Sequence, residues 1–193
     1  MRHLVFVLIF SVTVISHTSA QPSQQQTPRF TPAAEITFTF TRQTGSASNQ
    51  YAVWIENAQG QLIKTLYATR WTAAGGYRSR PASIPVWVRQ SGLAGMTSSQ
   101  VDAVSGATPR TGAVTYTWDG TDSRGALVPS GDYTLVLEGT LRWENQVLCR
   151  ALFRLGQLTS GQNAASPQVH IEYTGDSTAE RSMIADVRVR VLR

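Results

Sequence analysis

The chain has 193 residues, of which 41% are hydrophobic and 15% charged, and its formal net charge is +5. This composition excludes an intrinsically disordered protein, because enough apolar side chains are present to bury a core. The length favours a single domain, and the abundance of glycine, threonine and valine favours strands and turns over helices.

The N-terminus has the features of a secretory signal peptide. Arg2 precedes an apolar run from Leu4 to Ile15, and Thr18-Ser19-Ala20 supplies the small residues before a signal peptidase site. The apolar run is too short to span a bilayer, and no other segment reaches the length that a span requires. We therefore expect residues 1–20 to be removed and the mature protein, starting at Gln21, to be periplasmic without membrane insertion.

The segment 21–34 is polar and contains proline, which predicts a disordered lead-in to a single domain at 35–193. The mature chain carries 16 cationic and 12 acidic residues, a net charge of +4, with no dense basic run. Such a distribution is typical of a solvated surface, and we expect no nucleic acid partner. Cys149 is the only cysteine, so an intrachain disulfide cannot form.

Alternation of apolar and polar residues predicts the strands in chain order. In the first strand, residues 35–41, Ile36, Phe38 and Phe40 share one face. Two apolar runs joined by the turn 57–60 predict a hairpin. These runs and the later predicted strands cover 51–56, 61–67, 113–118, 132–141, 147–155, 168–173 and 183–192. Eight or nine strands with almost no helix predict an all-β fold, an immunoglobulin-like antiparallel β-sandwich.

The strand pattern is interrupted by a long excursion from Thr69 to Met96. Loops of this length inside a compact domain are uncommon and often functional. The following segment, 97–104, is predicted to form one or two helical turns, with Ser99 and Asp102 spaced as a capping box.

The sequence offers few groups for catalysis. Once the signal peptide is removed His170 is the only histidine, and a lone histidine within a strand is typical of a structural side chain. One histidine and one cysteine cannot complete a zinc site, and the loop starting at Asp119 lacks the glycine and the glutamate of a calcium loop. We predict no catalytic residue, no metal site and no enzymatic activity. A hydrolase that uses His170 is the alternative to test.

The segment 102–108 is the strongest candidate for a binding site. Gly106 and Ala107 leave backbone amides uncovered for a phosphate, Ser105 and Thr108 supply hydroxyls, and Asp102 can orient them or bind a cation. The structural alternative is a helix end followed by a small-residue turn.

These seven residues, Asp-Ala-Val-Ser-Gly-Ala-Thr, resemble the Asp-x-x-Ser/Thr-Gly-Ala-Thr motif at which periplasmic flavin transferases attach FMN through a phosphoester. The resemblance implies that Thr108 is the acceptor. It also implies that Asp102, Ser105, Gly106 and Ala107 are recognition residues.

A broader resemblance covers residues 35–155. The segments Tyr-Ala-Val-Trp-Ile-Glu-Asn at 51–57, the loop at 101–112, and Trp-Asp-Gly-Thr-Asp-Ser-Arg-Gly at 118–125 are similar to a bacterial periplasmic family known as domain of unknown function 2271. That resemblance implies a place beside PepSY and flavin-transfer genes, near extracytoplasmic flavin electron transfer or metal uptake. It also implies that the loop is a fold signature. The segment from Trp118 to Tyr133 resembles the immunoglobulin-like module of flagellar hook-capping proteins.

We therefore predict an exported, non-enzymatic accessory module that binds a protein partner in the periplasm or the inner membrane, in association with flavin electron transfer. A first alternative is a flavin carrier with covalent FMN at Thr108. A second is a domain that binds a ligand through the 69–96 excursion.

Overall fold

The computed structural model describes residues 33–44, 48–141, 145–156, 168–175 and 180–192. The predicted signal peptide, 1–20, and residues 21–32 of the predicted lead-in lie outside the described residues. The strands are β1 (Ala34–Phe40), β2 (Gln50–Asn57), β3 (Leu62–Thr69), β4 (Ser105–Gly106), β5 (Gly112–Trp118), β6 (Gly131–Thr140), β7 (Gln146–Leu155), β8 (Val169–Thr174) and β9 (Ile184–Val191). The helices are α1 (Arg70–Ala73), α2 (Pro85–Gln90) and α3 (Ser98–Val104), with single 3-10 turns at η1 (Gly76–Arg78), η2 (Leu93–Gly95) and η3 (Glu180–Ser182).

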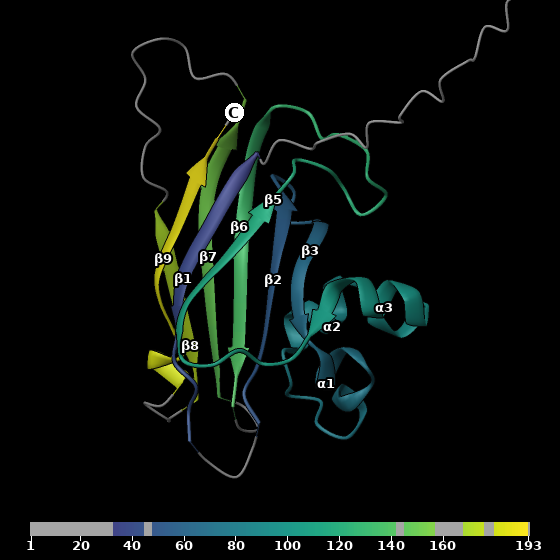
Figure 1. The fold of residues 1–193 in the computed structure, drawn as a ribbon, viewed down its shortest axis with the longest axis vertical. Helices are drawn as coiled ribbons and strands as arrows, with labels where there is room; N and C mark the ends of the chain where they lie inside the picture. The colour runs from purple at the N-terminus through teal and green to yellow at the C-terminus, as the bar shows by residue number, and fades with distance from the viewer. Residues whose placement is uncertain (1–32, 45–47, 142–144, 157–167, 176–179, 193) are drawn as a thin grey trace, which may run out of the picture.

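The strands form two sheets packed face to face, with the smaller sheet in front of the larger one in Figure 1. The smaller sheet has the order β5-β1-β9, and the larger has the order β4-β3-β2-β6-β7-β8. Neighbouring strands are antiparallel except β3 and β4, which run parallel and pair Ala68 with Ser105 and Thr69 with Gly106. The predicted all-β sandwich is confirmed, and each predicted strand lies within two residues of an observed one.

The main core lies between the two sheets and follows the predicted alternation. Ile36, Phe38 and Phe40 of β1 are buried, while the threonines between them are partly exposed. They pack against inward-facing residues of the larger sheet such as Tyr51 and Leu137. Burying alternate apolar side chains is what fixes the register of each strand.

The 69–96 excursion is not an irregular loop but a set of short helices that cover the outer face of the larger sheet. Trp54 of β2 points to this outer face and packs in a second buried cluster with Ile84 and Trp87. Every residue of β2 except Asn57 is buried, because the strand has a core on each face. The expectation of almost no helix missed this layer.

The helix α2 begins directly over a buried carboxylate. Pro85 occupies its first turn, where the missing N–H is tolerated, and Glu138 Oε1 and Oε2 accept the N–H groups of Val86 (3.0 Å) and Trp87 (2.8 Å). Glu138 is fully buried, and this burial raises the pKa of its carboxyl to about 7 although the two backbone N–H groups act in the opposite direction.

The predicted helix at 97–104 is confirmed as α3, but its capping box was assigned two residues too far along the chain. Thr97 is the N-cap and exchanges hydrogen bonds with Gln100, so the capping box is Thr97–Gln100 and not Ser99–Asp102. The shift leaves the Asp102 side chain available for another contact. None of the helices in the described ranges is long and apolar enough to cross a bilayer.

Candidate functional site

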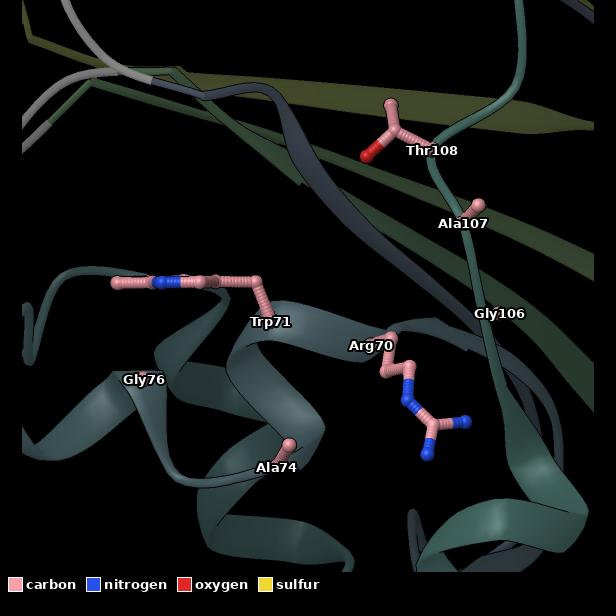
Figure 2. A pocket seen from close by; sticks show the side chains of 7 residues that line it. All are labelled: Arg70, Trp71, Ala74, Gly76, Gly106, Ala107 and Thr108. Atoms are coloured by element: carbon pink, nitrogen blue, oxygen red, sulfur yellow. The ribbon is translucent and has the colours of Figure 1, made fainter.

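Residues 106–108 of the candidate segment and the start of the helical excursion form two walls of one surface pocket, which has a volume of about 510 Å³. Figure 2 shows the loop after β4 on one side and the first turns of the excursion on the other. The lining residues are Arg70, Trp71, Ala74, Gly76, Gly106, Ala107 and Thr108. The two candidate regions of the sequence therefore belong to the same site.

The loop wall is fixed by close contact with Tyr67 of β3. The Tyr67 hydroxyl donates a 2.6 Å hydrogen bond to the Ala107 carbonyl. A Cβ atom at Gly106 would lie 2.9 Å from Tyr67 Cε2, closer than such contacts tolerate. Burial raises the pKa of Tyr67, so its hydroxyl stays protonated as the donor. Glycine at 106 is thus required for packing, which supports the fold-signature interpretation of this residue.

The Thr108 hydroxyl is held at the edge of the pocket. Thr108 is half-buried, and its Oγ1 donates a 3.2 Å hydrogen bond to the carbonyl of Asn49. In Figure 2 this oxygen points to the side of the loop on which Trp71 lies. The hydroxyl is therefore attached to an anchored backbone and borders the open space of the pocket.

Trp71, which is 43% exposed, forms the opposite wall. A Cβ atom at Gly76 would lie 2.5 Å from both Trp71 Cδ2 and the Trp71 carbonyl oxygen, so only glycine fits beside this indole. The guanidinium of Arg80 lies 4.9 Å from the centre of the Trp71 ring. Burial lowers the pKa of Arg80, and its side chain also donates to the carbonyls of Ser48 and Leu141.

Two of the predicted site residues do not line the pocket. Asp102 is exposed on α3 and forms a 2.9 Å ion pair with Arg70, which does line it. Ser105 pairs with Ala68 of β3, and within the described part of the chain its Oγ is buried without a hydrogen-bond partner. The structure thus brings together Gly106, Ala107 and Thr108 directly, with Asp102 one contact away.

The segment that contains both walls of the site is rich in arginine, and Arg70 lines the pocket itself. Between residues 69 and 112 the sequence has five arginines and one acidic residue, Asp102. The arginines are Arg70, Arg78, Arg80, Arg89 and Arg110. This segment has a net charge of +4, a value that favours a negatively charged ligand.

The remaining chemical candidates lie apart from the pocket. His170 is exposed on β8, 3.2 Å from Glu172, and β8 is at the edge of the larger sheet opposite β4. Cys149 is buried in the main core, and burial raises the pKa of its thiol to about 12.

Asp119, the first residue of the loop considered for calcium, forms an ion pair with Lys64 at 3.1 Å. In the described residues no group of three His, Cys, Asp or Glu side chains is placed to hold a metal ion.

Sequence reasoning missed the second wall, Arg70 to Gly76, as part of this site. Its signals were a tryptophan soon after the predicted strand 61–67 and the pair Gly75-Gly76 within the excursion. Neither signal indicates which other segment this wall would face.

Among the comparisons with known proteins, the scan against family models gives a match that covers most of the chain. No significant match was found among the curated proteins or among the solved structures. The resemblances to the flavin-attachment motif and to the hook-capping module therefore stay predictions. The family described as "Predicted periplasmic protein (DUF2271)" matches residues 33–173, a range that contains the whole pocket, and the chain belongs to this family.

Proposed function

We propose that this periplasmic protein is a non-enzymatic flavin carrier, with FMN esterified to Thr108 and its ring system held in the pocket. The observation that carries the proposal is the position of the Thr108 hydroxyl. It lies on a fixed loop at the edge of a pocket whose wall includes three consecutive residues of the attachment motif.

The size and charge of the pocket support this ligand. A volume of about 510 Å³ is within the range of sites that bind cofactors and drug-sized molecules. A phosphodiester at Thr108 keeps one negative charge, and the surrounding segment has five arginines against one aspartate. Arg70 is the arginine that lines the pocket itself.

Attachment requires an activated donor, because a free phosphate monoester does not esterify a hydroxyl in water. FAD supplies one, through a flavin transferase in the same compartment. Thr108 Oγ forms the new bond to the phosphorus of the FMN half, the pyrophosphate P–O bond breaks, and AMP leaves. The hydroxyl proton passes to a base of the transferase. The Asn49 carbonyl loses one 3.2 Å hydrogen bond in exchange. The carrier then passes electrons to a protein partner without catalysing a reaction itself.

The test is the intact mass of the protein secreted in the presence of a flavin transferase. We expect the mature chain to gain the mass of one FMN less one water and to be yellow. Thr108→Ala removes the acceptor oxygen, so this variant should show neither change. Thr111→Ala is the matched control, because Thr111 is an exposed threonine in the same loop but outside the motif.

An unmodified wild-type mass would reject covalent attachment. Titration of the unmodified protein with FMN then separates the two remaining functions. Saturable binding that persists in Thr108→Ala would indicate a reversible ligand site, whereas no binding would leave the accessory module without a cofactor.

A further inference from the structure

We propose that the isoalloxazine ring of the bound flavin packs against Trp71. This inference rests on the proposed function, since it assigns the resting place of the ring that Thr108 would anchor. Trp71 and Thr108 lie on opposite walls of the same pocket, and the ribityl chain of FMN joins the phosphate to the ring across that space.

Trp71 differs from the other described tryptophans in its exposure. Trp54, Trp87 and Trp118 are fully buried and fill the two cores, whereas Trp71 is 43% exposed. A large aromatic side chain that lines a pocket without being buried is typical of a contact for a flat ligand.

The exposed indole is also held in place. Gly76 packs against it so closely that no Cβ atom fits, and Arg80 lies 4.9 Å from its ring centre. Arg80 is in turn anchored by the backbone carbonyls of Ser48 and Leu141. An aromatic surface that is rigid before binding loses little conformational entropy when a ligand packs on it.

A flavin ring in contact with an indole has a distinct optical signature. The excited flavin takes one electron from the indole, and the electron then returns, so the emission is lost without net chemistry. Phenol donates an electron in the same way, but the ring of phenylalanine does not. The residue type at position 71 therefore controls the fluorescence of each bound flavin, an effect that a structural role alone would not produce.

Typical energies of aromatic pairs keep two rings together roughly two to ten times as often as apart. A bound flavin emits only while its ring is out of contact with the indole. Trp71→Phe, which removes the quenching ring, should therefore raise the fluorescence per bound FMN by about threefold to tenfold. Trp71→Tyr should stay as dim as the wild type. Tyr67 could also quench a flavin, but it is not among the residues that line the pocket.

The experiment uses protein whose mass confirms one FMN per chain, so that failed attachment and failed ring contact are distinguished. Tyr173→Phe is the matched control, because Tyr173 is 41% exposed but lies on β8, at the edge of the sheet opposite β4. It should leave the fluorescence unchanged. Loaded Trp71→Phe with wild-type fluorescence, or an equal rise in Tyr173→Phe, would overturn the assignment of the ring to Trp71.

Discussion

Trp87→Ala should destabilise the protein by about 3–5 kcal/mol, the usual range for removing a buried tryptophan. Trp87 is fully buried in the second buried cluster, on the outer face of the larger sheet. Its indole N–H donates a 3.0 Å hydrogen bond to Thr65, and its backbone N–H binds Glu138. The substitution leaves a cavity and also removes the donor that ties α2 to β3.

Urea denaturation followed by circular dichroism measures this effect, and Trp71→Ala is the control. Both tryptophans belong to the same excursion, but Trp71 is 43% exposed. Its removal should cost clearly less than that of Trp87, because a partly exposed side chain buries less apolar surface and its loss leaves no enclosed cavity. Equal losses in the two variants would contradict the existence of a second core. A separate early transition in Trp87→Ala would instead show that the excursion unfolds on its own.

The strands could be predicted because their pattern is local. Ile36, Phe38 and Phe40 are buried, and the threonines between them are partly exposed. The alternation in the sequence therefore predicts both the strand and the face of it that is buried. The same holds for β9, where Val187 and Val189 are buried between exposed charged residues. No contact with a distant segment is needed to interpret such a pattern.

The helices of the excursion could not be predicted in this way. Each is too short to show a 3.6-residue period, and the N-cap of α2 is Ile84, which has a φ of 41°. A β-branched residue is rarely stable in that conformation. Ile84 is held there because its side chain is fully buried and its N–H donates to Thr140 of β6. These are tertiary contacts, and the local sequence does not contain them.

For a related reason, only one wall of the site could be predicted from the sequence. The motif at 102–108 is contiguous, but its facing wall is set by the parallel pairing of β3 with β4. Because Thr69 pairs with Gly106, the chain leaves both strands at the same place, into Arg70 and Trp71 on one side and into Ala107 and Thr108 on the other. A two-residue strand gives no periodic signal, so the sequence could not reveal this pairing.

The protein should become less stable as the pH rises from about 4.5 to about 7, because the buried Glu138 carboxyl loses its proton in this range. Burial raises the pKa of this group from an ordinary 4.5 to about 7 in the folded state. Between these values the folded state binds more protons than the unfolded state, so the free energy of unfolding falls as pH increases. The full difference corresponds to about 3 kcal/mol and is complete above pH 7.

Glu138→Gln should remove this slope, because the amide stays neutral throughout. It should also lower the stability by a pH-independent amount of about 1–3 kcal/mol, since the amide nitrogen cannot accept one of the two N–H groups that Val86 and Trp87 direct at the carboxylate. The variant should therefore be less stable than the wild type at pH 4.5 and nearly equal to it at pH 7.5. Free energies of unfolding from urea titrations at both pH values provide the measurement.

Two described carboxyl groups with a lowered pKa, Asp119 and Asp122, do not obscure the result. Hydrogen bonds from Thr121 and Lys64 keep the pKa of Asp119 below its usual value of 3.8 despite partial burial, and backbone hydrogen bonds from Ala126 and Arg124 do the same for Asp122. A group with a lowered pKa contributes stability that is lost only as the pH falls through its folded value, which lies below the Glu138 window. A wild-type slope that survives in Glu138→Gln would assign the titration to another group and would leave α2 resting on a carboxylate that is already charged at pH 4.5.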